Sequence, residues 1–205
     1  MAMMKYKSIC IVGVDGTGKS STIEKLQNLL GEDNVTVQYM GARLWETNLA
    51  KRNVEVQVHS FPLRAIMYTY SYVYEMYHRV FKHNKSSNIV VFDRYAYEHV
   101  YLRENEDKGF INRITNAIFR FFLIDIFPKP NLTFYLFCPI EISISRKGDI
   151  ESNDEKEALI RNKRCLDNCY LHKKGVRVID TSIHTQDVVL NRIMEDMVKD
   201  GLLTE

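Results

Sequence analysis

The stretch Gly13-Val14-Asp15-Gly16-Thr17-Gly18-Lys19-Ser20 has the spacing Gly-x4-Gly-Lys-Ser/Thr that is typical of a phosphate-binding loop. An apolar run over residues 9–12 leads into it, and a helical pattern begins near Lys19. Glycines allow backbone N–H groups to form a concave nest for phosphate oxygens, and the helix N-terminus adds positive charge at the same place. The sequence therefore predicts a strand, a loop and a helix that together bind a nucleoside triphosphate.

Two side chains of this loop have expected roles toward the nucleotide. Lys19 should hold the β and γ phosphates, and the Ser20 hydroxyl should coordinate Mg²⁺. We expect ATP and Mg²⁺ as the cofactors, because fixed cations stabilise the charge of a transferred phosphoryl group. The loop residues expected to contact the nucleotide are Gly13, Asp15, Gly16, Thr17, Gly18, Lys19, Ser20 and Ser21.

Asp15 is an unusual residue for a phosphate-binding loop, because an anion repels the ligand unless its side chain points elsewhere. One interpretation turns the carboxylate toward an acceptor hydroxyl or a nearby cation. The other makes Asp15 a residue that shapes the loop through an Asx turn. The sequence leaves both interpretations open.

Composition narrows the class of protein. The 205 residues suit one domain with a sizeable core, and the net charge of +2 is too small to indicate nucleic-acid binding. The sequence contains no secretory signal and no apolar run long enough to span a membrane, so we expect a cytoplasmic protein. The four cysteines lack the spacing of a zinc site and are expected to be buried free thiols.

Apolar, strand-like runs alternate with helical patterns along the whole chain. This alternation predicts an α/β fold, a parallel sheet with helices on both faces. Parallel sheets bind ligands beyond the carboxyl ends of their strands. Arg43, Asp93-Arg94 and Asp180 each follow a predicted strand, so we expect them to share one edge of the sheet with the loop after the first strand. The predicted strands cover residues 8–12, 35–40, 89–92, 132–137 and 176–179.

Asp93 and Arg94 directly follow a predicted buried strand. Asp93 could bind Mg²⁺ through water or orient an acceptor, and Arg94 could hold an acceptor phosphate through two hydrogen bonds. The alternative is a structural ion pair at a strand end. We take Lys19, Asp93, Arg94 and Arg146 as the candidate catalytic residues.

Two further groups of side chains have open roles. Arg146 and Lys147, with the basic residues 161–164, could belong to a lid that excludes water, although a solvated helix face explains residues 161–164 equally well. The small lid would cover residues 147–157. A predicted helix over residues 62–82 is rich in aromatics, and Tyr68 is the candidate for stacking on a base, although such aromatics mostly form the core.

Several of these motifs together resemble the thymidylate kinase family of nucleoside monophosphate kinases. They are Gly-Val-Asp-Gly-Thr-Gly-Lys-Ser-Ser at 13–21, Phe-Asp-Arg-Tyr at 92–95, Pro-Ile-Glu-Ile-Ser-Ile-Ser-Arg-Lys at 139–147 and Val-Ile-Asp-Thr-Ser at 178–182. The resemblance implies one kinase domain over residues 1–205, a five-stranded sheet of order 2-3-1-4-5 and a possible homodimer.

The resemblance also implies roles for individual residues. Asp15 would face the sugar of the acceptor, and Arg94, more loosely with Arg43, would hold its phosphate. Arg146 would be the lid arginine. Asp180 and Ser182 would lie beside the donor adenine. Two features depart from the family pattern: Tyr72 stands where members commonly carry a thymine-recognising arginine, and residues 148–157 contain no arginine.

The leading hypothesis is transfer of the γ-phosphoryl group of ATP to a nucleoside monophosphate, with dTMP as the first candidate. A kinase of a nucleoside or another small hydroxyl compound is the alternative within the enzyme class. A nucleotide-binding module without an acceptor is the alternative outside it. In each case the expected partners are small nucleotides, with neither nucleic acid nor membrane.

Overall fold

The structure is a computed structural model that describes residues 4–41, 45–55, 61–104, 109–148 and 152–204. Arg43 and residues 149–151 of the predicted lid lie outside the described residues. The chain forms two compact units. The sheet unit comprises residues 6–39, 86–94 and 130–205, and the helical unit comprises residues 1–5, 40–85 and 95–129.

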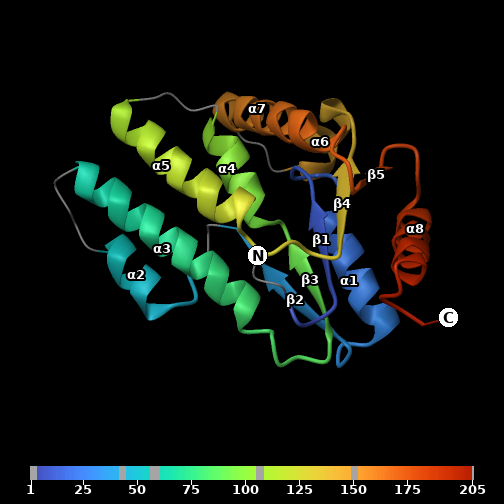
Figure 1. Cartoon of the computed structure of the whole chain (residues 1–205). Coiled ribbons are helices and arrows are strands. Elements are labelled where there is room, and N and C mark those ends of the chain that lie inside the picture. The colour runs from blue at the N-terminus through green and yellow to red at the C-terminus, as the bar shows by residue number, and fades with distance from the viewer. Residues whose placement is uncertain (1–3, 42–44, 56–60, 105–108, 149–151, 205) are drawn as a thin grey trace. The chain divides into compact units, whose positions relative to one another are not determined.

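The sheet unit is built on five parallel strands in the order β2-β3-β1-β4-β5 (Figure 1). All residues of β1 are buried, as expected for a central strand covered on both faces. The predicted class, parallel sheet and strand order are confirmed. The strands are β1 (Ser8–Val12), β2 (Val35–Tyr39), β3 (Ile89–Asp93), β4 (Leu132–Phe137) and β5 (Val176–Asp180).

Helices α1 (Lys19–Leu30) and α8 (Gln186–Lys199) pack on one face of this sheet. Ile23 and Leu26 of α1, with Ile193 and Met197 of α8, join the inward side chains of the strands in one core. The hydroxyl of Thr185 accepts a hydrogen bond from the Val188 amide and caps α8. This packing fixes α1, and with it the end of the phosphate-binding loop.

Helices α6 (Ile140–Lys147) and α7 (Asn153–Tyr170) belong to the other face. The rings of Tyr135 on β4 and Tyr170 on α7 stack with centroids 5.3 Å apart, and the Tyr135 hydroxyl donates to Asp167 at 2.5 Å. All four cysteines are free as predicted, and three are buried. Cys169 is only half-buried, so the expectation of complete burial is wrong for this thiol.

The helical unit contains α2 (Asn48–Glu55), α3 (Phe61–Phe81), α4 (Ala96–Glu104) and α5 (Phe110–Arg120). Helices α3 and α5 pack side by side (Figure 1). A π-helical turn, η1 (Phe121–Asp125), continues α5, and the Ile126 amide donates to the Phe121 carbonyl at 3.2 Å. The helical pattern of the sequence over residues 110–126 therefore ends in a wider turn, which the apolar pattern alone does not reveal.

Candidate active site

The phosphate-binding loop passes very close to two other backbone segments. A Cβ added at Gly13 would lie 2.6 Å from the Leu136 carbonyl oxygen, and one at Gly16 would lie 2.3 Å from the Ser143 carbonyl oxygen. Gly16 also has a φ of +84°, which side chains rarely tolerate. Glycine is therefore required at both positions for steric reasons, and Gly16 ties the loop to α6.

Lys19, at the start of α1, folds back over the loop. Its Nζ donates to the Val14 carbonyl at 2.7 Å and lies 3.8 Å from the Asp15 carboxylate. The side chain is 6% exposed, so its charge lies in a partly desolvated position where electrostatic interactions are strong. Thr17 supports the same carbonyl through its hydroxyl, at 2.8 Å.

Asp15 and Arg94 meet directly: the Asp15 carboxylate accepts a hydrogen bond from Arg94 Nη2. The Asp15 carboxylate is therefore turned toward two cations, Arg94 and Lys19. This is one of the arrangements that the sequence left open. Arg94 has a φ of +68°, a strained conformation for a residue with a side chain. Its amide donates to the Ile11 carbonyl at 3.0 Å, so neighbouring strand ends hold this backbone in place.

Asp93 completes this group of charges. Burial raises the pKa of its carboxyl group above the usual value, and the neighbouring Asp15 raises it further, while Lys19 and Arg94 act in the opposite direction. Its buried Oδ1 has no hydrogen-bond partner among the described residues. An unpartnered carboxylate oxygen fits a metal, a metal-bound water or an acceptor hydroxyl.

A polar cavity of about 210 Å³ opens beside the loop. Arg146 forms part of it, because its guanidinium donates to the Thr181 carbonyl at 2.8 Å and to the Thr181 hydroxyl at 3.3 Å. Arg146 thus contacts the end of β5. The cavity is lined by Thr17, Gly18, Ser21, Thr22, Arg146, Thr181, His184, Gln186 and Val189.

Asp180 and Ser182, expected beside the donor adenine, bond to each other. Asp180 accepts from the Ser182 amide at 2.8 Å and from its hydroxyl at 2.5 Å, which closes the turn after β5. Neither residue lines the polar cavity, whereas Thr181, between them, does. Thr181 belongs to the stretch 180–182 that the resemblance places beside the donor adenine, whereas sequence reasoning missed His184 and Gln186, which follow in the connection from β5 to α8 and at the start of α8.

Tyr68 lies in an aromatic cluster within the helical unit. Its ring stacks on Tyr72 at 6.1 Å and meets the edge of Trp45 at 5.9 Å. The imidazole ring of His99 also stacks on Tyr72, with the ring centroids 4.1 Å apart. Tyr72 is buried. Sequence reasoning also missed Trp45, although it is the only tryptophan in the chain.

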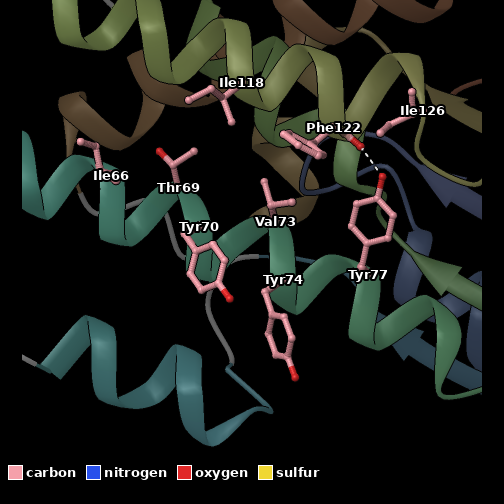
Figure 2. A pocket seen from close by; sticks show the side chains of 9 residues that line it. All are labelled: Ile66, Thr69, Tyr70, Val73, Tyr74, Tyr77, Ile118, Phe122 and Ile126. Carbon is pink, nitrogen blue, oxygen red and sulfur yellow. Dashed lines mark hydrogen bonds between the residues drawn. The ribbon is translucent and has the colours of Figure 1, made fainter.

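An apolar cavity of about 560 Å³ lies in the helical unit, between α3 on one side and α5 with η1 on the other. Figure 2 shows its aromatic wall and the hydrogen bond of the Tyr77 hydroxyl to the Phe122 carbonyl, 2.9 Å long. Thr69 contributes a hydroxyl, and all the described residues that line the cavity are uncharged. The lining residues are Ile66, Thr69, Tyr70, Val73, Tyr74, Tyr77, Ile118, Phe122 and Ile126.

Two features are absent from the part of the chain that the structure describes. No cluster of three or more His, Cys, Asp or Glu side chains could hold a metal ion there. Within the same residues, every helix is too short or too polar to cross a membrane.

Comparisons with known proteins support the fold. The fold is similar to that of thymidylate kinase from Candida albicans, with a TM-score of 0.67, 19% identity, and coverage of 96% of this chain and 93% of that one. It is also similar to a deoxyadenosine kinase from M. mycoides with bound dATP, with a TM-score of 0.64, 16% identity, and coverage of 93% and 98%.

A search of curated protein sequences gives no match. The family model described as thymidylate kinase, however, matches residues 11–191, which include the phosphate-binding loop, the Asp-Arg-Tyr motif and the end of β5. The chain therefore belongs to the thymidylate kinase family.

Proposed function

We propose that the protein transfers the γ-phosphoryl group of ATP to a nucleoside monophosphate, with dTMP as the first candidate acceptor. The observation that carries this proposal is the contact of Asp15 with both Lys19, on the donor side, and Arg94, on the acceptor side. Two cationic groups joined through one carboxylate at the edge of one sheet suit a reaction between two phosphates. Family membership supports nucleotide kinase activity more generally.

In this reaction an oxygen of the acceptor phosphate attacks the γ phosphorus of ATP. A new oxygen–phosphorus bond forms, the bond to the β-phosphate oxygen breaks, and ADP leaves with the electron pair. Lys19 would neutralise the β and γ phosphates, and Arg146 would bind the donor from the side of β5. Arg94 would hold the acceptor phosphate in line, so that most of the catalysis is positioning.

The residues for Mg²⁺ would be Ser20, through its hydroxyl, and Asp93, whose buried Oδ1 is available. When bound, Mg²⁺ neutralises phosphate charge. Asp15 would release Arg94 when an acceptor phosphate binds and then face the acceptor sugar. Arg43 would add a second contact to that phosphate, and Tyr68 would contact the base. Asp180 and Ser182 would shape the adenine end of the donor site.

One observation favours a second candidate, a kinase of unphosphorylated nucleosides. Arg94 already has an anionic partner in Asp15, so an acceptor phosphate must compete for it. A nucleoside would leave this pair intact and present a hydroxyl to Asp93. The kinase with bound dATP, which is described as a deoxyadenosine kinase, lends this alternative support from the fold.

A coupled assay of ADP release with a panel of nucleoside monophosphates and their nucleosides separates these functions. We expect turnover with at least one monophosphate, and a rise in its KM with little change in that of ATP when Arg94 is replaced by alanine. Turnover with nucleosides only would favour the second candidate. Slow ATP hydrolysis that no acceptor changes would indicate a nucleotide-binding module.

We further propose a homodimer through the apolar face formed by α3, α5 and η1. Nine large apolar side chains on it are between 36% and 77% exposed. Since such side chains each have roughly 150–250 Å² of surface, the face exposes on the order of 800 Å², about one side of a stable dimer interface. These residues are Leu63, Ile66, Tyr70, Tyr74, Phe110, Ile114, Ile118, Phe121 and Phe122.

Sedimentation velocity tests this surface. We expect a dimer at micromolar concentration for the unaltered chain and a monomer for Ile118→Glu, because the charge would be buried. Val188→Glu, at an exposed apolar position on α8, is the matched control and should stay dimeric. A monomer in the unaltered chain, or a mixed complex only with another protein, would contradict the homodimer.

The remaining expectations concern the whole chain. We propose that residues 1–205 act as one kinase domain with a small lid over residues 147–157, and that the protein is cytoplasmic. The start of α7, where Ser152 accepts a hydrogen bond from the Glu155 amide at 3.2 Å, would form one end of this lid.

A further inference from the structure

Arg146 and Arg94 are both candidate contacts for phosphate, but they are held by different kinds of partner. Arg94 is paired with the Asp15 carboxylate. Arg146 is held by uncharged groups of Thr181, the first residue after β5. Its Nη2 donates to the Thr181 carbonyl at 2.8 Å, and its Nη1 donates to the Thr181 hydroxyl at 3.3 Å. Among the described residues, Arg146 forms no ion pair with a carboxylate.

Thr181 is itself fixed to the end of β4. Its amide donates to the Phe137 carbonyl at 2.8 Å, and its hydroxyl donates to the same carbonyl at 3.2 Å. Phe137 is the partner of Asp180 in the sheet, so these two bonds extend the pairing of β4 with β5 by one residue. Because both donors of Thr181 are turned toward β4, its carbonyl and hydroxyl oxygens are left as acceptors for the guanidinium.

Helix α6, which carries Arg146, is also fixed at its other end. The Ser143 carbonyl packs against Gly16 of the phosphate-binding loop. Ser143 is fully buried, and its hydroxyl lies 2.9 Å from the thiol of the buried Cys138. Arg146 follows less than one helical turn later and binds Thr181. One short helix therefore joins the loop to the turn after β5, and all of these residues belong to the sheet unit.

The uncharged partner leaves the positive charge of Arg146 available to a ligand. A carboxylate partner would cancel this charge, and an anionic ligand would have to displace it. Hydrogen bonds to neutral oxygens orient the guanidinium without cancelling its charge, and a cation that is already oriented needs no rearrangement when a phosphate binds. The guanidinium has further N–H donors besides the two that bind Thr181. These donors lie beside a polar cavity that Gly18 and Ser21 of the loop also line.

We propose that Thr181 is a positioning residue for ATP, which orients Arg146 toward the bound nucleotide without neutralising it. This inference rests on the proposed function for the identity of the ligand. The Thr181 hydroxyl donates to Phe137 and accepts from Arg146 at the same time, and among side chains of this size only a hydroxyl does both. Serine should therefore replace threonine here, whereas valine, which has a similar shape and no hydroxyl, should not.

Titration calorimetry tests this role without turnover. The probe is the β,γ-imido analogue of ATP, which is not hydrolysed, together with Mg²⁺. Thr181→Val should weaken its binding about fivefold, because a hydrogen bond from a charged donor is lost while the bond to the carbonyl remains. Thr181→Ser should bind within about twofold of the unaltered protein. Unchanged affinity in Thr181→Val, equal losses in both variants, or no binding to the unaltered protein would overturn the proposal.

A double variant shows whether Thr181 acts through Arg146. Arg146→Ala alone should weaken binding of the analogue more than Thr181→Val does, because it removes the charge itself. In the Arg146→Ala background, Thr181→Val should then have no further effect on the affinity. Additive losses would show that Thr181 acts independently of Arg146 and would refute the positioning role. Thr181→Ala, which also lacks the hydroxyl, replaces Thr181→Val in both measurements if the valine variant does not fold.

Thr36→Val is the matched control, because the same substitution removes another hydroxyl that accepts a hydrogen bond in the sheet unit. The Thr36 hydroxyl accepts from Asn88 Nδ2 at 3.3 Å, and its strand, β2, lies at the opposite edge of the sheet from β5. Affinity for the analogue should not change in this variant. A loss as large as in Thr181→Val would indicate a general effect of the sheet and contradict the proposal.

Turnover separates this inference from the proposed function. In the kinase assay, Thr181→Val should raise the KM of ATP about fivefold and leave the KM of the acceptor within about twofold. Turnover with an unchanged KM of ATP in this variant would refute the positioning role alone. Weaker binding of the analogue to Thr181→Val, without turnover of any acceptor by the unaltered protein, would keep the positioning role and refute the kinase reaction.

Discussion

The phosphate-binding loop and helix α3 each contain a pair of opposite charges, but the two pairs lie in different surroundings. At the loop, the side chains of Asp15 and Arg94 are 34% and 23% exposed, so a ligand could displace either side chain from their ion pair. On α3, Glu75 and Arg79 are fully buried and bound to backbone groups. The charges that a ligand could displace therefore lie near the surface, while the charges that hold a segment in place are buried and make several hydrogen bonds.

The largest expected effect comes from removing the loop cation. Lys19→Ala should lower kcat by roughly 10²–10⁴-fold, because charge on the phosphates loses its fixed partner. The melting temperature should change much less than kcat, since the Lys19 ammonium donates to a carbonyl of the loop itself. Lys25→Ala on the same helix is the control, because its pair with Asp187 is exposed and should affect neither quantity. Equal losses in both variants would contradict the assignment of Lys19.

Gly16→Ala should be the most destabilising single change at the loop. Its Cβ would meet the Ser143 carbonyl oxygen at 2.3 Å, and its φ is +84°. Gly18 has a similar φ of +85°, but a Cβ added there would have no heavy atom within 4 Å among the described residues. Gly18→Ala therefore measures the backbone strain without the steric clash. Chemical denaturation should show Gly16→Ala less stable than Gly18→Ala by about 1–3 kcal/mol. Equal stability would mean that α6 does not press on the loop.

The backbone of Arg94 at the loop is strained, and two substitutions separate this strain from the role of the guanidinium. Both Arg94→Ala and Arg94→Gly remove the guanidinium and should raise the acceptor KM by roughly 10–100-fold. The free energy of unfolding of Arg94→Gly should exceed that of Arg94→Ala by about 1 kcal/mol, because glycine accepts the φ of +68° without strain. Thermal unfolding of the two variants measures the difference. A more stable Arg94→Ala would show that the conformation carries no strain.

The smallest expected effect is the pH dependence of Asp93. Because its folded pKa is raised by burial, its charge costs stability at pH values above that pKa, and the cost vanishes below the unfolded pKa of about 4. Lys19 and Arg94 face this carboxyl group and limit the cost, whereas Asp15 adds to it. Asp93→Asn should therefore raise the melting temperature by a few degrees at pH 7 and not at pH 3.5, while activity falls.

Most of the sheet and its loop could be predicted from the sequence because backbone geometry demands particular residues there. Only glycine fits at positions 13 and 16, and an apolar run such as Ile9–Val12 suits a central strand. The ion pair of Asp15 with Arg94 could not be predicted in the same detail, because it depends on how the ends of β1 and β3 lie beside one another. The order of the predicted strands placed Asp15 and Arg94 at one edge of the sheet, but it did not show which side chains they contact.

The helical unit was harder to predict, because its contacts join residues that no local pattern connects. From the sequence alone, Glu75 and Arg79 are an ordinary pair of charged residues on a helix. Only the structure shows that the amides of Glu46 and Thr47 donate to Glu75. The stretch over residues 44–60 has no clean periodicity, yet it contains α2 and Trp45. Aromatic residues of α3 divide between the core, as Tyr72 does, and the exposed face, as Tyr70 does, and composition does not separate them.

The most direct test of the central claim follows the phosphoryl group itself. ATP labelled at the γ phosphate is incubated with the unaltered protein, Mg²⁺ and dTMP, or with another monophosphate from the panel, and the products are separated. We predict that the label appears in the nucleoside diphosphate and that Arg94→Ala greatly slows its appearance. Label released only as inorganic phosphate, at a rate that no acceptor and no change at Arg94 affects, would contradict the account.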